Sequence, residues 1–242
     1  MFRLFKLKPP HGWSAVAWEL TIVTLGVLIA LAAQQVVESI HERGEARDAG
    51  QAIRGELEHN MALLRSRADK KPCVDARLAE LQALIDSAGA SGGAIKTPNW
   101  VGRPQFWTMQ MSRWQATSQA GRAALVPADE LALYGGMYSY MANVNAAMAD
   151  EQEDWARLRS LEHLGRLTPE MQFQLTSTLQ QARYINWRMN VWTKQLRSLF
   201  DQLHLRVVVV RNIPPSRSAC VPMNTPREQA VRESNSYTGD EP

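Results

Sequence analysis

The sequence predicts an all-α protein in which one N-terminal transmembrane helix continues into an extracytoplasmic helical bundle built around a long antiparallel αα-hairpin. Three observations predict this fold. An apolar run from Trp13 to Val37 is long enough to cross a bilayer. Two stretches within residues 128–204 repeat apolar side chains every three or four residues, as helices do. The connection between those stretches is short and carries residues that end and start helices.

The apolar run is the most informative segment of the chain. From Leu20 to Ala33 it contains no charged residue, proline, asparagine or glutamine. Counted back to Trp13, about 21 residues of helix cover about 30 Å, which is the thickness of the hydrocarbon core. The sequence therefore predicts four parts: a cytoplasmic tail over 1–12, a span over 13–37, a helical domain over 38–213 and a mostly disordered tail over 214–242.

The charges on either side of the run predict its orientation. Arg3, Lys6 and Lys8 stand ahead of it without an acid, whereas acidic residues are frequent just after it. Because Lys and Arg stay on the cytoplasmic side, we expect a bacterial inner-membrane protein with its N-terminus in the cytoplasm and its bulk in the periplasm. Glu19, at the inner edge of the span, is either an interfacial carboxylate or a contact with a partner helix. It is the candidate span contact.

Two other interpretations of this segment stay open. A cleaved signal peptide would use the small residues of Ala30-Leu31-Ala32, although the helical pattern continues beyond them without a break. A pilin-like precursor would use Gly12 and an early glutamate, but Glu19 stands two residues later than that family places it. A lipoprotein is excluded because no cysteine lies near the run.

The span also carries a family resemblance. It contains Glu19-Leu20, then Gly26-Val27-Leu28-Ile29-Ala30-Leu31, then Gln34-Gln35. This order resembles the N-terminal signature E-[IL]-x-x-V-x-x-G-[IV]-L-[IL]-A-L-x-[IVA]-[NQ] of an uncharacterised bacterial family of single-pass membrane proteins, a domain of unknown function. Further on, Trp114-Gln115-Ala116, Gly121 and Leu125-Val126-Pro127 resemble a second stretch of such proteins. The resemblance implies a membrane anchor with a helical extracytoplasmic domain, and no established activity.

The chain has two cysteines, Cys73 and Cys220. An even count outside the cytoplasm favours a disulfide. Such a bridge would close a loop of about 150 residues, which the chain-entropy model values at about 4–5 kcal/mol. Two separate thiols are the alternative. We expect no redox catalysis, because the sequence contains no Cys-x-x-Cys motif.

Three helices and a loop are predicted before the hairpin. The span continues as one helix to about Lys71, where Pro72 ends it. A second helix carries a clean apolar stripe of Val74, Leu78, Leu81 and Ile85. Residues 87–104 hold four glycines and two prolines and are predicted to be a loop. A third helix is expected from about Gln105 to Ala120.

The hairpin has the strongest helical signal. Apolar residues follow a 3-4 spacing from Leu131 to Trp155 and an unbroken 4-3 spacing from Met171 to Leu203. In the connection, Gly165 suits a helix C-terminus, Thr168 an N-cap and Pro169 the first helical position. The sequence thus predicts a hairpin over 128–204 with arms of roughly 50 Å.

Two features of this region extend the prediction. Asn145 and Gln152 fall within the apolar seam of the first arm, and we expect them to fix its register, as buried polar residues do in coiled coils. After the second arm, the four residues from Val207 to Val210 are β-branched, and the sequence leaves open whether residues 206–210 form a strand or a helix end.

The sequence carries no ligand site that we expect to bind a metal or a cofactor. Acid-x-x-His pairs of the kind that di-iron bundles use occur at Glu38/His41, Glu56/His59 and Asp201/His204. The first two lie about 27 Å apart on one helix, and no Glu stands in the hairpin seams to complete a site. Nucleophile motifs and phosphate-binding glycine loops are absent from the sequence.

Charge and architecture together favour an interaction role. The formal net charge is +3 and dispersed, which argues against nucleic-acid binding. We expect a membrane-anchored interaction or scaffold protein, either a homo-oligomer or an accessory subunit of an envelope complex, whose partners are the lipid bilayer and protein. The alternative is a ligand-sensing ectodomain that signals through a partner, because a 12-residue tail has no room for an output domain. We do not expect an enzyme.

Overall fold

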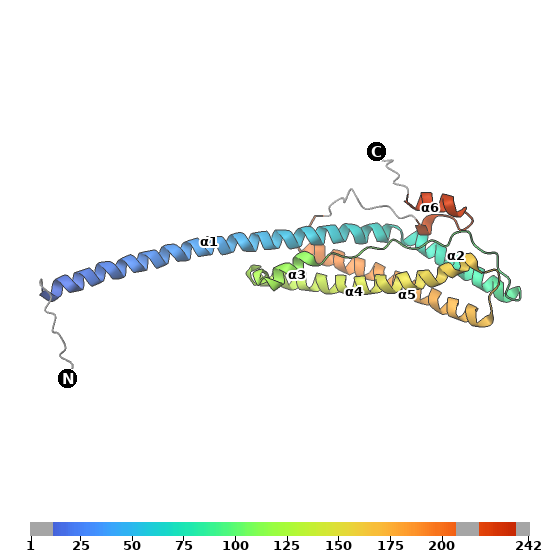
Figure 1. The fold of residues 1–242 in the computed structure, drawn as a ribbon, viewed down its shortest axis with the longest axis horizontal. Helices are drawn as coiled ribbons and strands as arrows, with labels where there is room; N and C mark the ends of the chain where they lie inside the picture. The colour runs from blue at the N-terminus through green and yellow to red at the C-terminus, as the bar shows by residue number, and fades with distance from the viewer. Residues whose placement is uncertain (1–11, 207–217, 236–242) are drawn as a thin grey trace, which may run out of the picture.

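The computed structural model describes residues 12–206 and 218–235 (Figure 1). Every regular element within these ranges is helical, which confirms the all-α prediction for this part of the chain. The one β-type pairing there is an isolated bridge between Ala94 and Arg166. The predictions for residues 1–11 and for residues 207–210 lie outside the described residues.

Helix α1 (Gly12–Asp69) runs without a break for 58 residues. No proline interrupts it, so the apolar N-terminal half and the amphipathic C-terminal half join in one helix about 87 Å long. In Figure 1 its first half extends well beyond the rest of the molecule, while its second half lies along the other helices. One helix therefore belongs to two very different environments.

Helix α2 (Lys71–Ala90) follows after a single turn residue, Lys70. The prediction that Pro72 ends the first helix was wrong in detail, because α1 stops at Asp69 and Pro72 lies in the first turn of α2. Proline is accepted there because the first turn has no intrahelical partner for its missing N–H group. The stripe predicted on this helix is buried as expected: Val74, Leu78, Leu81 and Ile85.

The segment from residue 91 to residue 111 is mostly irregular, and α3 (Ser112–Gln119) is shorter than the helix predicted from Gln105. The reason is that two amide side chains take the place of helical hydrogen bonds. Asn60 bonds to both the backbone N–H and the carbonyl of Gln110. Asn145 does the same at Met109. A 3₁₀ turn, η1 (Arg122–Leu125), follows α3.

Helices α4 (Ala128–Leu158) and α5 (Pro169–Gln202) pack along each other more extensively than any other pair of helices that the structure describes. The 3₁₀ turn η2 (Arg159–His163) and a few further residues connect them. The predicted start of the second arm is confirmed. Thr168 is the N-cap, its side chain accepts a hydrogen bond from Met171 N, and Pro169 is the first helical residue.

Two hydrophobic clusters divide the bundle lengthwise. We call the end from which the exposed half of α1 departs the near end, and the opposite end the far end. The near-end core joins α1 to α4 and α5 through residues such as Leu57, Met141 and Phe200. The far-end core joins α2 to α4 and α5 through residues such as Leu81, Trp155 and Leu179.

The C-terminal segment is ordered in the described range 218–235, contrary to the prediction of a mostly disordered tail over 214–242. It forms the 3₁₀ turn η3 (Ser218–Cys220) and the helix α6 (Arg227–Asn235). Trp100, Val221 and Ala230 bury one another in a small third cluster. Figure 1 shows α6 lying over the side of the bundle near α2.

Candidate interaction surfaces

The first half of α1 exposes its apolar side chains all around the helix. Trp13 is 83% exposed and Trp18 is 66% exposed, and the large apolar side chains described between Val16 and Ile40 are 40–67% exposed. None of the 18-residue apolar window is buried, and α1 is the one described helix long and apolar enough to cross a membrane. Glu19 lies on this exposed half and has no hydrogen bond or ion pair within the described residues.

Helix α5 carries an aromatic and arginine patch made of Tyr184, Trp187, Arg188 and Trp192. Tyr184 and Trp187 are exposed, whereas Trp192 is half-buried and packs partly against the near-end core. The rings of Tyr184 and Trp187 stack with centroids 5.9 Å apart. The Arg188 guanidinium lies 4.3 Å from the ring of Trp192 and 5.4 Å from that of Tyr184. These stacking and cation–π contacts restrict the rotamers of the side chains in the patch.

A polar groove lies between α1 and α5. Its volume is about 300 Å³, and it is lined by Met61, Arg65, Ala68, Asp69, Asn190, Thr193, Lys194, Arg197 and Asp201. The side chains of Arg65, Lys194 and Arg197 form no hydrogen bond or ion pair with the described residues. Sequence reasoning missed this groove because its residues lie on the polar faces of two helices that are far apart in the chain.

Behind the groove, a buried network links α1 to α4, α5 and α2. Arg67 donates to Glu151 Oε1 at 2.7 Å and to Asn186 Oδ1 at 3.0 Å, and Asn186 donates to Asp75 at 2.6 Å. Burial raises the pKa of Glu151, although the Arg67 charge and hydrogen bond act in the opposite direction. The side chains of Arg67 and Glu151 are 3% and 1% exposed. Removing one partner of such a buried ion pair lowers the free energy of unfolding, because the other charge is then left buried without a partner.

At the near end, buried Glu56 holds α3 in place. Its carboxylate accepts hydrogen bonds from Ser112 Oγ, from the backbone N–H groups of Arg113 and Trp114, and from Tyr138 Oη. The negative charge therefore lies at the N-terminus of α3, where the helix dipole favours it. Burial, and next the hydrogen bond to Glu56, raise the pKa of Tyr138.

These contacts bear on the candidate metal ligands. Glu56 directs its carboxylate toward the N-terminus of α3, so its oxygens already have protein partners. His41 is at 3.7 Å from Glu45 on the exposed part of α1. Within the described residues, no group of three or more His, Cys, Asp or Glu side chains is close enough to hold a metal ion.

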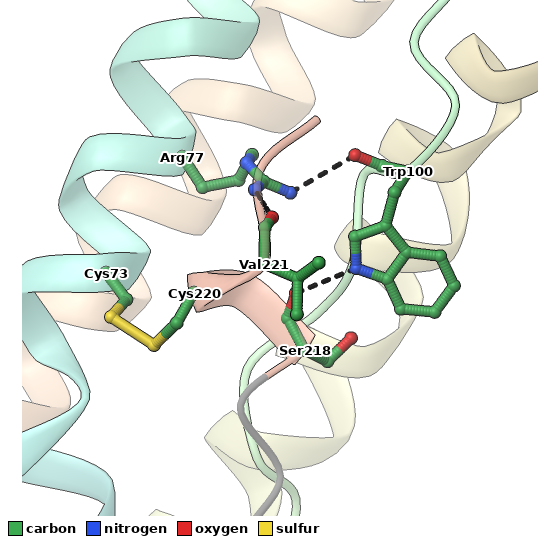
Figure 2. The surroundings of a disulfide bond; sticks show 6 residues. All are labelled: Cys73, Arg77, Trp100, Ser218, Cys220 and Val221. Carbon is green, nitrogen blue, oxygen red and sulfur yellow. Dashed lines mark hydrogen bonds between the residues drawn. A yellow bond between two sulfur atoms is a disulfide. The ribbon is translucent and has the colours of Figure 1, made fainter. Parts of the chain in front are cut away.

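At the far end, a disulfide joins Cys73 of α2 to Cys220 of η3 across 147 residues of sequence (Figure 2). Beside it, buried Arg77 donates to the carbonyl oxygens of Trp100, Val101 and Val221. Desolvation lowers the pKa of Arg77, while the hydrogen bond and charge of Glu80 act against that shift. The disulfide and Arg77 together fix the C-terminal segment to the bundle.

The surrounding backbone is shaped for this contact. Trp100 Nε1 donates to the carbonyl of Ser218 at 2.9 Å, as Figure 2 shows. Gly102 has a φ of +70°, and a Cβ there would lie 2.2 Å from the same carbonyl oxygen. Only glycine combines this backbone conformation with such a close approach.

The polar residues predicted within the hairpin seam, Asn145 and Gln152, form hydrogen bonds with the segment before α3. Asn145 bonds to the backbone of Met109, and Gln152 accepts a hydrogen bond from Arg103 on the surface. Within the described residues neither has a hydrogen-bond partner on the opposite arm, and their effect on the register of the hairpin stays a prediction. Both instead hold the irregular segment between α2 and α3, which sequence spacing alone does not reveal.

Comparisons with known proteins give no relative. No protein-family model matches the chain, and neither the curated proteins nor the solved structures contain a significant match. The resemblance of the span to a family of single-pass membrane proteins stays a prediction. A functional assignment therefore rests on the geometry of the chain itself.

Proposed function

We propose that this protein is a single-pass, membrane-anchored interaction protein that presents a helical bundle to protein partners. In this proposal its N-terminus is cytoplasmic and its bundle is in the bacterial periplasm, either self-associated or as an accessory subunit of an envelope complex. Its role is binding, without an enzymatic reaction. The span, the orientation and the compartment all belong to the proposal.

The observation that carries the proposal is the continuity of α1. Its first half exposes apolar side chains around the whole helix, and its second half contributes Ile53, Leu57 and Leu64 to the near-end core. A bilayer is the natural solvent for the first half, since about 20 apolar residues suffice to cross it. The bundle would therefore be held at a fixed height by a stiff helix rather than by a flexible linker.

The patch on α5 supports a protein as the partner. Tyr, Trp and Arg are the residue types that contribute most often to binding hot spots. Trp187 and Tyr184 are 56% and 49% exposed, so a partner would remove a large aromatic area from water at this point. The cations of α5 near the patch favour an acidic counterpart.

The test is affinity purification of the tagged full-length protein from native membranes in mild detergent, followed by mass spectrometry and mass determination. We expect a stoichiometric partner or a defined homo-oligomer. Trp187→Ala combined with Tyr184→Ala should weaken a partner bound at the patch, whereas Phe173→Ala, an exposed aromatic outside the patch on the same helix, should not. A lone monomer that cross-links to nothing in cells contradicts the proposal.

The orientation has its own test. A reporter that is active only in the periplasm, fused after Pro242, should be active, and a reporter that is active only in the cytoplasm should be silent. The reverse pattern contradicts the proposed topology.

The groove between α1 and α5 favours a second candidate, a ligand-sensing ectodomain that signals through a partner's span. Its volume suits a small metabolite, and its excess of Arg and Lys favours an anionic one. Small carboxylates and phosphate esters should then raise the Tm of the full-length protein. Lys194→Gln should abolish that rise, whereas Arg157→Gln, at an exposed position of α4, should not. No stabilisation by any compound contradicts sensing and leaves the interaction role intact.

A further inference from the structure

Small and apolar residues line one face of the exposed half of α1. Starting at Gly26, they recur at intervals of four and three residues, the spacing of a coiled-coil seam. We call this face the outward seam, and its members are Gly26, Ala30, Ala33, Val37, Ile40 and Gly44. The leucines of the apolar run, Leu20, Leu25, Leu28 and Leu31, all fall on other faces.

The outward seam faces away from the bundle. At about 100° per residue, its members lie about half a turn around α1 from the residues that the bundle buries. Those buried residues begin with Ala49, Ile53 and Glu56. A second helix against the outward seam therefore meets no other described element of the same chain.

Lipid alone does not account for this face. Ile40 is 62% exposed and lies three residues beyond the predicted span, among charged residues such as Glu38 and Glu42. An apolar side chain there would be in water unless another protein surface covered it. Inside the span, the small residues permit close approach of a second helix, which bulky leucines would prevent.

Charges at the outer end of the outward seam identify the occupant. The outward seam supplies the a and d positions of a heptad repeat, with Gly44 at a and Arg47 at the next d. Arg43 is then a g position and Asp48 an e position, so the two lie on opposite flanks of the seam. In a parallel pair, Arg43 of one helix then faces Asp48 of the other, twice by symmetry. Neither side chain has a hydrogen bond or ion pair with the described residues of its own chain.

The ends of the seam are charged as well. Glu19 lies on the same face one heptad before Gly26, and Arg47 lies one heptad after Ile40. In a symmetric pair each would face its own copy, and like charges separate helices. The apolar part of the contact is therefore confined to residues 26–44, a length of about 27 Å, and the paired Arg43 and Asp48 flank its outer end.

We infer that two copies of this chain associate in parallel through the outward seam of α1, with Arg43 of each copy paired to Asp48 of the other. The inference rests on the proposed membrane anchoring, and it names the partner of that anchor as a second copy. Each bundle then lies on the outer side of the helix pair, with its α5 patch free for other proteins.

Cysteine cross-linking in native membranes tests the inference on the full-length protein. Ile40→Cys lies on the outward seam, and Glu42→Cys lies at nearly the same height on the opposite face. Under mild oxidation, Ile40→Cys should migrate mainly as a disulfide-linked dimer and Glu42→Cys as a monomer. Equal cross-linking at both positions, or none at Ile40→Cys, overturns the inference. Cross-linking of Ile40→Cys to a foreign protein alone also overturns it.

Two further variants separate specific pairing from chance encounter. Arg43→Asp should weaken dimerisation roughly two- to fivefold, and Arg43→Asp with Asp48→Arg should restore it, because exposed ion pairs are worth a few tenths to one kcal/mol each. Gly26→Leu should weaken the dimer through steric obstruction, whereas Leu28→Ala should not.

The result also distinguishes the inference from the proposed function. A stoichiometric foreign partner without an Ile40→Cys dimer contradicts the inference and supports the interaction role. A monomer with no partner of either kind contradicts both.

Discussion

The two ends of the bundle fasten their irregular segments by different chemistry. At the near end, Glu56, Asn60 and Asn145 hold residues 109–114 by accepting hydrogen bonds from backbone N–H groups. At the far end, a disulfide and the three carbonyl contacts of Arg77 hold the C-terminal segment. The difference teaches that only the far end depends on the redox state of its surroundings.

The buried ion pair of Arg67 and Glu151, between the two ends, should have the largest effect on the free energy of unfolding. Arg67→Met would leave Glu151 buried without its charged partner, which should cost about 3–5 kcal/mol of the free energy of unfolding. The measurement is denaturant unfolding of the full-length protein in detergent. Arg67→Met with Glu151→Met should recover much of the loss, because no buried charge is then left unpaired. A double variant as unstable as the single one would contradict this account.

Removal of the disulfide should affect the far end alone. Cys73→Ser with Cys220→Ser should lower the free energy of unfolding by about 2–5 kcal/mol, the chain-entropy value being the upper limit. Limited proteolysis should then cut the C-terminal segment first, while α3 stays protected. Reduction of the wild-type protein should reproduce the pattern, and the double serine variant should not respond to reductant. Simultaneous cleavage at α3 would show that the two ends are not independent.

The stability of the near end should not depend on reductant. Glu56→Gln replaces an acceptor of four hydrogen bonds by an amide whose N–H₂ group faces donors, which should cost about 2–3 kcal/mol. The loss of Tm should be the same with and without reductant. Glu153→Gln, at an exposed glutamate on α4, is the matched control and should change the Tm little.

The smallest effect concerns pH. Burial raises the pKa of Asp154 to about 6, and the neighbouring acids Asp150, Glu151 and Glu153 add to the rise against the lowering by Arg157. The folded state thus binds a proton that the unfolded state has released, so this group's contribution to stability falls as pH rises from about 4 to 6. Asp154→Asn should gain about 1–2 kcal/mol over wild type at pH 7.

The same comparison should vanish at low pH. Below about pH 4 both states of the wild-type protein carry a protonated Asp154, so the variant and the wild type should have nearly equal stability. Thermal unfolding across pH 3.5–7.5 measures the difference. A gain that is constant over this range would contradict titration of Asp154 as its cause.

Local signals predicted the helices well. The apolar spacing of 131–203 defines α4 and α5, and Thr168-Pro169 starts α5 because an N-cap acts only on the next few residues. The stripe on α2 was likewise predicted and is buried. Each of these features depends on residues that are close together in the chain.

The features that sequence analysis missed depend on distant partners. Residues 105–111 are not helical because Asn60, 50 residues earlier, and Asn145, 36 residues later, bind their backbone. The C-terminal segment is ordered because Arg77 reaches Val221 across 144 residues. A polar residue on a helix face gives no sign, in the sequence alone, of which remote carbonyl it will meet.

Because α1 is unbroken, it fixes the direction in which the bundle faces, measured as a rotation about the α1 axis, relative to the apolar half of the same helix. One residue inserted between Glu38 and Asp48 would turn the bundle by about 100° and lift it by about 1.5 Å. Seven inserted residues would nearly restore its original facing while lifting it by about 10 Å. A series of such insertions would therefore separate the importance of the bundle's height from that of the direction in which it faces.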